Sequence, residues 1–440
     1  MKKMLSIWIV ATMPLLLALP LVAQASAPDA SAEPAQAPQA QPGLLRPLAG
    51  AQLQSSGGLE MQPGLMVPSF GFSEIATTGL GETGYRTAVN GSLSYNAVSA
   101  RRSFTVKYDG GGLFDTKNEA SNESYQRLSL SESLAIRRWT FDLGNEFSYL
   151  PIAPVGSGLG IPGLGQLASG LSFSNLYPNL LPSQSILTLN TNSLNNSSFG
   201  QVQYNFTRQT SVTATANYGI LRYPDYSALD AHQAVFSAGL NHRMGRAQTA
   251  LQYSYSHFGY SETASGMETQ SAQLMYSRGL GRSFTAQVAA GPEIIHTHGL
   301  DVPNRLTGSG LASIGYARKV NRLELRYSRG ANGGSGLLQG ELSDSVQLSA
   351  GRQYRVWSVT ANGSYVRNRG IVRQVRSSYD SAGLELTRSI DRIFGTYFSY
   401  TYMKQAAGDL CFAGTCALNG DEQVFGFGFN WQPRGWRVGH

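Results

Sequence analysis

Two histidines separated by one residue are the first candidates for chemistry in this chain. His296 and His298 would share a face on a β-strand, where they could hold a metal ion. The sequence offers no third ligand beside them, and they stand where a strand runs into an external loop. We therefore expect exposed loop histidines and no resident metal, with a two-histidine metal pair as the alternative.

A second motif is the cysteine pair in "CFAGTC". An isolated close pair in an exported chain most often closes a small loop, so we expect a disulfide between Cys411 and Cys416. Metal binding is the weaker interpretation because no histidine or acidic cluster adjoins the pair. Redox catalysis would favour a two-residue spacing at a helix start, which is absent here.

Nucleophilic catalysis finds little support in the sequence. The segments "GSGLG" and "GSGLA" both miss the Gly-x-Ser-x-Gly pattern of a nucleophile elbow. No dense acidic cluster for Ca²⁺ or Mg²⁺ is present either. We therefore expect no enzyme and no cofactor.

Charged side chains that could select ions or solutes form the remaining group. They recur on the polar side of alternating segments, and lining a pore would let them tune its selectivity. Mutual pairing that stiffens the protein is the alternative, and the mixed signs give no clear ion preference. The candidates are Lys107, Asp142, Glu146, Glu324, Arg326 and Glu385.

Period-two alternation predicts the β-strands that would position these charges. In "TSVTATANYGILR", at 210–222, apolar residues alternate with threonine, asparagine and glycine. In "VFGFGFNW", Phe425, Phe427, Phe429 and Trp431 alternate with glycine and asparagine. The apolar side is aromatic and aliphatic, whereas the polar side is mostly serine, threonine, glutamine, asparagine and glycine.

The composition favours a transmembrane β-barrel over a soluble sheet. Only 14% of the residues are charged, and the chain contains 50 glycines, 22 tyrosines and 18 phenylalanines. Beyond the N-terminal segment there is no run of 18 apolar residues, which excludes a helical membrane protein. Lipid outside and a polar interior explain the two strand faces. A secreted β-sandwich or β-helix is the competing fold.

Arginine-bracketed tight turns set the strand count. In "YSRGLGRSFTAQV" and its variants, turn centres fall near residues 101, 138, 208, 245, 281, 319, 354 and 390. The spacing is about 36 residues, or twice that once, which suits two membrane strands, one short turn and one longer loop. A first strand at 67–78 and a last one at 421–431 complete an antiparallel up-and-down barrel of 16–18 strands.

The same turns should lie in the periplasm, because barrels of this type have short periplasmic turns and long external loops. Their arginines can rest on apolar surface and hold their charges among lipid phosphates, with Tyr276 at interface depth. The predicted interface anchors are Arg278, Arg282, Arg318, Arg322, Arg388 and Arg392. The longer connections, rich in glycine, asparagine and serine, should lie outside the cell.

The N-terminal region should not belong to the barrel. Residues 1–25 resemble a secretory signal peptide, with Lys2 and Lys3 before an apolar stretch; a signal anchor is the alternative. Residues 26–62 form an Ala/Pro/Gln-rich leader that cannot bury a core, and we expect it to be disordered. The barrel then spans 63–432 and a tail spans 433–440. A long apolar loop at 150–195 either folds into the lumen or forms an extra external hairpin.

The signal peptide, the leader, the evenly spaced strands and the aromatic last strand together resemble Gram-negative outer-membrane β-barrel proteins over 63–431. The resemblance implies that Phe425, Phe427, Phe429 and Trp431 form the signal read by the barrel-insertion machinery. Val424 and the tail "QPRGWRVGH" depart from that signal's usual form. A fainter likeness is to barrels found beside polysaccharide-export systems.

These observations favour a porin-like passive channel for small solutes in the Gram-negative outer membrane. The alternatives are an export port or accessory barrel for a surface polysaccharide, and a structural or adhesive surface barrel. The expected partners are outer-membrane lipid, the insertion machinery, and small solutes or polysaccharide. Nucleic acid is excluded by export, and homo-oligomerisation is left open.

Overall fold

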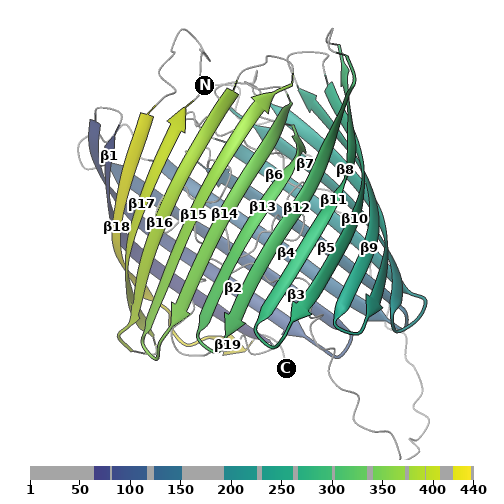
Figure 1. The fold of residues 1–440 in the computed structure, drawn as a ribbon. Helices are drawn as coiled ribbons and strands as arrows, with labels where there is room; N and C mark the ends of the chain where they lie inside the picture. The colour runs from purple at the N-terminus through teal and green to yellow at the C-terminus, as the bar shows by residue number, and fades with distance from the viewer. Residues whose placement is uncertain are drawn as a thin grey trace, which may run out of the picture. The chain divides into compact units, whose positions relative to one another are not determined.

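The protein is a closed antiparallel β-barrel, seen here in a computed structural model (Figure 1). The structure describes residues 64–79, 82–115, 123–150, 193–224, 230–260, 266–299, 303–333, 340–371, 376–391, 393–406 and 420–437. Among the described residues, no helix has the length and apolar character needed to cross a membrane.

Eighteen long strands form the wall, and each pairs with its neighbours in chain order. They are β1 (Leu65–Gly79), β2 (Glu82–Val98), β3 (Arg102–Asp115), β4 (Glu123–Ile136), β5 (Trp139–Leu150), β6 (Ser193–Asn205), β7 (Thr210–Arg222), β8 (Ala231–Met244), β9 (Ala247–Tyr260), β10 (Gly266–Leu280), β11 (Phe284–His298), β12 (Arg305–Arg318), β13 (Asn321–Asn332), β14 (Glu341–Gln353), β15 (Trp357–Gly370), β16 (Arg376–Ser389), β17 (Phe394–Ala406) and β18 (Gly420–Trp431). A two-residue strand, β19 (Trp436–Arg437), pairs with the start of β1.

Antiparallel pairing of β1 with β18 closes the ring. Phe70 lies opposite Trp431 in this seam, and their rings stack with centroids 5.5 Å apart. On the inward side, Ser69 Oγ donates a hydrogen bond to Asn430 Oδ1 at 2.8 Å. The predicted first and last strands are therefore both present, and they settle the count at 18.

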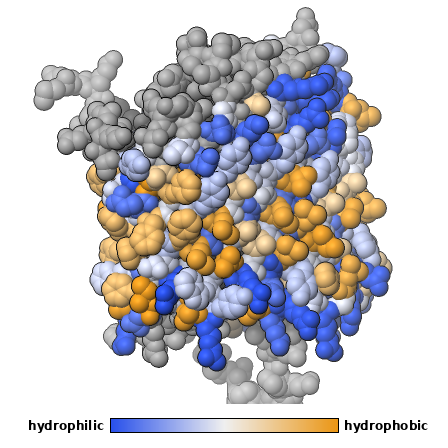
Figure 2. Space-filling model, turned by 60° about the vertical axis from the view of Figure 1, so that its left-hand side comes forward, coloured by the Kyte–Doolittle hydropathy of each residue, from blue (hydrophilic) through white to orange (hydrophobic). Residues whose placement is uncertain are grey.

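Alternation along each strand separates an apolar outer surface from a polar inner one. Leu251 and Leu274 lie opposite each other on neighbouring strands and are 58% and 64% exposed. On the inward side of the same strands, the hydroxyls of Ser254 and Ser271 are hydrogen-bonded at 2.7 Å. Figure 2 shows the apolar side chains of one face gathered in a belt, with hydrophilic side chains along its lower edge. An outer apolar belt of this kind suits contact with lipid.

All eight predicted turn positions fall at tight hairpins, which lie together at the lower end of the barrel in Figure 1. Gly245 and Gly281 adopt positive φ there, which glycine tolerates, whereas Lys319 adopts φ 48° despite its side chain. Because outer-membrane barrels have short periplasmic turns, we call this the periplasmic end and the opposite one the external end.

The strands are longer than the roughly ten residues expected from membrane thickness, ranging from 12 to 17. Segments predicted as external loops are therefore partly strand. The segment from Asp109 to Asp115 belongs to β3, and the glycine-rich segment at 328–344 contains the ends of β13 and β14. The glycines and aspartates of these segments suggested loops. The paired strands nevertheless continue through them, past the length that the membrane alone requires.

Four sequence predictions fall on residues outside the described ranges. These are the signal peptide at 1–25, the leader at 26–62, the disulfide of Cys411 and Cys416, and most of the apolar loop at 150–195. The described parts of that last range are Leu150, at the end of β5, and the start of β6 from Ser193.

Candidate functional site in the barrel lumen

Strand register places the six predicted lumen charges on the inward-facing side of the wall. Lys107 lies opposite Ser129, Asp142 opposite Gln201, and Glu385 opposite Ser399, and all of these partners belong to the inward-facing set. Glu146, Glu324 and Arg326 follow the same pattern. Their role in selectivity stays a prediction.

Four charges on neighbouring strands form what we call the β3–β5 charge cluster: Lys107, Asp109, Arg127 and Glu146. Lys107 Nζ lies 3.6 Å from Asp109 Oδ2, and Arg127 forms an ion pair with Glu146. Register places Asp109 directly opposite Arg127. Two cations and two anions thus alternate across the wall. Asp109 is only 2% and Arg127 only 6% exposed, so the charges of the cluster are compensated by each other and not by water.

A second group of charges lies on β13 and β16. Glu324 and Arg326 are two residues apart on the same face of β13, opposite Ser349 and Gln347 of β14. Glu385 is buried and accepts a hydrogen bond from Thr387 Oγ1 at 3.0 Å. Glu324 and Arg326 come from the side of the ring opposite β4, because β4 and β13 are nine strands apart in a ring of 18, whereas β16 is six strands from β4 through the β1–β18 seam.

Sequence reasoning missed Asp109 and Arg127. Asp109 begins a glycine run that was interpreted as loop, and Arg127 stands in a serine-rich stretch. The signal was present, since Lys107 and Asp109 are spaced by two, as are Arg127 and Ser129. Extending the alternation through the glycines would have placed both residues on the inward side.

The predicted interface arginines do not all lie on one face. Arg278 lies opposite Ala247 on the outward side of β10, and Arg282 is exposed in the following turn. Arg388 also faces outward, with its guanidinium carbon 5.0 Å from the centroid of the Trp357 ring. Arg318 is outward as well, opposite Asn321.

Arg322 differs from this set, and Arg392 lies outside the described residues. Arg322 lies opposite Ala317 and Gly351, on the lumen side of β13 at the periplasmic end. Arg322 thus differs in strand face from the outward arginines, and its role as a periplasmic interface anchor stays a prediction.

The two neighbouring histidines lie at the end of β11, within the strand and not in a loop. Both face outward, where Glu268 of β10 lies opposite His296. Glu268 Oε1 is 3.3 Å from His298 Nε2 and 3.5 Å from His257 Nδ1. Within the described part of the chain, no three such side chains are arranged to hold a metal ion.

One hydrogen bond joins two strand ends at the external end. The backbone amide of Tyr223 donates to Asp230 Oδ1 at 2.7 Å and ties the end of β7 to the start of β8. Burial, together with the nearby Asp230 charge, raises the pKa of Tyr223 to about 12.

Comparisons with known proteins do not assign a family to the chain. No family model and no curated protein matches the chain. Among solved structures, Pseudomonas aeruginosa OccK2 (OpdF) in complex with glucuronate is 12% identical, with a TM-score of 0.46 over 84% of this chain and 100% of that one.

Two further structures show the same level of similarity. Acinetobacter baumannii OccAB4 is 7% identical, with a TM-score of 0.44 over 85% of this chain and 99% of that one. The E. coli ferric-catecholate import receptor Fiu is 10% identical, with a TM-score of 0.40 over 82% and 81%. Likeness at this level does not assign a solute or a mechanism.

Proposed function

We propose that this chain is a porin-like protein of the Gram-negative outer membrane, through which small hydrophilic solutes diffuse passively. The observation that carries the proposal is a closed ring of 18 strands with an apolar outer belt and a polar, charged inner face. Side chains cannot fill the interior of a barrel this wide, so an aqueous path remains unless a segment plugs it.

The lumen charges would give such a channel its selectivity. Groups on the lumen side of β3–β5 and of β13–β16 include both signs of charge. Because the cations and anions of the β3–β5 charge cluster pair with each other, the cluster adds little net charge to the lumen. Glu324 and Glu385 add two carboxyl groups to the lumen side of β13 and β16.

Conductance of the purified barrel in planar lipid bilayers tests the channel function. We expect discrete single-channel steps, and the double variant Glu324→Gln/Glu385→Gln should shift the reversal potential in a salt gradient towards anions. Glu74→Gln is the matched control, since Glu74 faces outward opposite Phe427 and accepts a hydrogen bond from Thr87 Oγ1 at 2.9 Å. It should leave the reversal potential unchanged.

A folded barrel that gives no current steps, also after deletion of residues 151–192, would overturn the channel function. The partners of the proposed function are outer-membrane lipid along the apolar belt and the insertion machinery at the last strand. Phe425, Phe427, Phe429 and Trp431 face outward there and are between 37% and 48% exposed, which leaves them accessible to such machinery.

A further inference from the structure

Three arginines gather on the outer surface of the barrel at its external end. Arg367 and Arg369 are two residues apart on β15 and therefore share a face. That face is the outward one, because it also carries Tyr365, which is 45% exposed. Arg376 begins β16 and lies directly opposite Arg369. We call Arg367, Arg369 and Arg376, all of them exposed, the external arginine patch.

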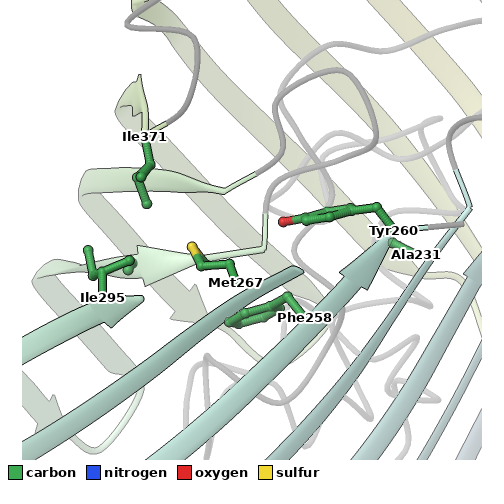
Figure 3. Packing of buried hydrophobic residues seen from close by; sticks show 7 residues of the cluster. Ala231, Phe258, Tyr260, Met267, Ile295 and Ile371 are labelled. Carbon is green, nitrogen blue, oxygen red and sulfur yellow. The ribbon is translucent and has the colours of Figure 1, made fainter. Parts of the chain in front are cut away.

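Packing on the lumen side holds the backbone that carries this patch. Ile371, which directly follows β15, belongs to a buried apolar cluster that includes Met267 and Ile295. Figure 3 shows the Ile371 side chain pointing towards these two residues. The Ile371 amide also donates a hydrogen bond to the Gly340 carbonyl at 3.0 Å. The end of β15 is therefore anchored from within, while its arginines point to the opposite side of the wall.

The positive charge of the patch has no partner in the described part of the chain, where none of its guanidinium groups has an ion pair, a hydrogen bond or a ring contact. The carboxylate opposite Arg367 is that of Asp344. It already accepts a hydrogen bond from the Tyr327 hydroxyl at 2.9 Å and pairs with Arg329 at 3.3 Å. Like charges directly opposite each other on neighbouring strands destabilise a sheet. The patch thus retains a repulsion that a bound anion would relieve.

Other outward cations on these strands do have partners nearby. Arg388, at the periplasmic end of β16, lies over the Trp357 ring at 5.0 Å. Lys404 of β17 lies opposite Asp380 of β16. An aromatic ring or a carboxylate thus accompanies each of these cations, whereas the patch has neither.

The patch lies at the depth expected for lipid headgroups. Tyr365 is the next residue on its face towards the middle of the barrel, followed on the neighbouring strands by Leu348 and Leu384. These two leucines are 46% and 44% exposed, as contact with acyl chains would require. Aromatic side chains mark the membrane interface of such barrels. The arginines follow directly beyond the tyrosine, on the external side.

We propose that the external arginine patch binds the phosphate groups of a phosphorylated glycolipid of the outer leaflet, whose acyl chains lie along Leu348 and Leu384. Guanidinium groups donate paired hydrogen bonds to phosphate oxygens, and a phosphate between Arg369 and Arg376 offsets their repulsion. A free phosphate ion would meet only the arginines, whereas a lipid also covers the leucines. This inference rests on the outer-membrane location within the proposed function, and not on whether the barrel conducts.

Binding of lipid A, a glycolipid with two phosphates, to the folded, detergent-purified barrel tests the site. Native mass spectrometry measures the bound lipid. Arg369→Gln/Arg376→Gln should weaken binding by about 10-fold or more, because two charge-assisted hydrogen-bonding groups are lost. The matched control is Arg222→Gln/Arg305→Gln, which removes the same charge from the external ends of β7 and β12. It should leave the affinity unchanged.

Three outcomes of this titration would overturn the site. Equal losses in the two double variants would mean that overall charge at the external end attracts the lipid. Equal wild-type affinity for lipid A and for its dephosphorylated form would exclude phosphate recognition. Complete displacement of lipid A by inorganic phosphate at equal concentration would assign the patch to free anions instead of lipid.

Urea unfolding supplies a readout that a purely structural role would not move. Without lipid A, Arg376→Gln should raise the urea midpoint, because it removes the repulsion with Arg369. Urea adds no ions, so this repulsion is not screened. With lipid A in the micelles, the wild-type barrel should gain more stability than the variant, because a ligand stabilises the state that binds it. An equal gain in both proteins would contradict the site.

Conductance separates this site from the channel function. Because the patch faces outward, Arg369→Gln/Arg376→Gln should keep the current steps of the wild-type barrel. A conducting barrel that binds lipid A no more tightly than this variant overturns the site and leaves the channel standing. A barrel that binds lipid A through the patch but gives no current overturns the channel and leaves the site standing.

Discussion

Arg127 forms an ion pair with one carboxylate of the inner wall and lies opposite a second, so its loss should affect the stability of the barrel. Its ion pair with Glu146 has side chains only 8% and 11% exposed, and Asp109 lies opposite it. Removing one partner of a buried pair leaves the other charge uncompensated, which costs about 3–5 kcal/mol. We therefore expect Arg127→Ala to lower the free energy of unfolding by about this amount in a guanidinium titration of the detergent-refolded barrel.

Arg102→Ala is the control for that substitution. Arg102 Nε lies 2.7 Å from Glu132 Oε1, so the pair has good geometry, but its side chains are 60% and 32% exposed. Solvent screens such pairs, and their loss costs about 0–1 kcal/mol. Comparable losses in the two variants would mean that water in the lumen screens the β3–β5 charge cluster as well as bulk solvent does.

Which residues face the lumen was predictable from the sequence, whereas which of them pair was not. The face follows from period two, so Lys107 and Glu146 were found without any knowledge of neighbours. Pairing depends on the register of adjacent strands, which a single sequence does not reveal. Arg127 meets Glu146 because of how β4 aligns with β5, and nothing local to either residue signals that contact.

One glycine of β11 lies so close to the neighbouring backbone that a larger residue should destabilise the barrel. A Cβ atom at Gly291 would lie 1.7 Å from the Ala272 carbonyl oxygen of β10, next to a gap in the β10–β11 pairing at Ala272 and Gln273. The clash involves backbone, which cannot rotate away. We expect Gly291→Ala to destabilise the barrel by about 1–3 kcal/mol, measured as a lower guanidinium midpoint.

Gly279→Ala tests whether that loss comes from the clash or from glycine replacement in general. Gly279 is also an inward-facing strand glycine of this hairpin, and an added Cβ would meet nothing within 4 Å. Its substitution should be neutral within about 0.5 kcal/mol. A midpoint that falls equally in both variants would refute the steric explanation.

Strand existence and turn positions were predictable, but strand ends were not. Tight turns are marked by glycine and arginine at regular spacing, and all eight were located. At the external end, the β12–β13 pairing stops at Gly310 and Arg329 although β13 continues to Asn332, where the sequence indicated only a glycine-rich loop. The residues beyond Arg329 contact Glu293 and Tyr260 of strands β11 and β9, and local sequence patterns contain no sign of these contacts.

Closure of the ring brings together the first and the last long strand of the chain. Ser69 and Asn430 bond across a seam that joins residues 361 positions apart, whereas every other pair of long strands is formed by chain neighbours. Bringing such distant segments together carries the largest loop-closure cost in the barrel. Formation of the β1–β18 seam is therefore expected to limit the folding rate.

Trp431 should consequently matter more for folding speed than an equivalent tryptophan elsewhere. Its ring lies 5.5 Å from Phe70 across the seam and 6.4 Å from Phe394. Trp139 makes two comparable ring contacts, one with Phe141 of the same strand and one with Tyr204 of the neighbouring strand β6. Each substitution to alanine should cost about 1–3 kcal/mol, at roughly 0.5–1.5 kcal/mol for each aromatic contact.

Only Trp431→Ala should also slow the appearance of folded barrel in a time course of refolding into detergent, followed by the mobility shift of unheated samples on gels. Weakening a contact that forms in the rate-limiting step lowers the folding rate, whereas weakening one that forms outside that step mainly raises the unfolding rate. If Trp139→Ala slows refolding to the same extent, seam closure does not limit the rate. The barrel would then form its wall and close it in one concerted step.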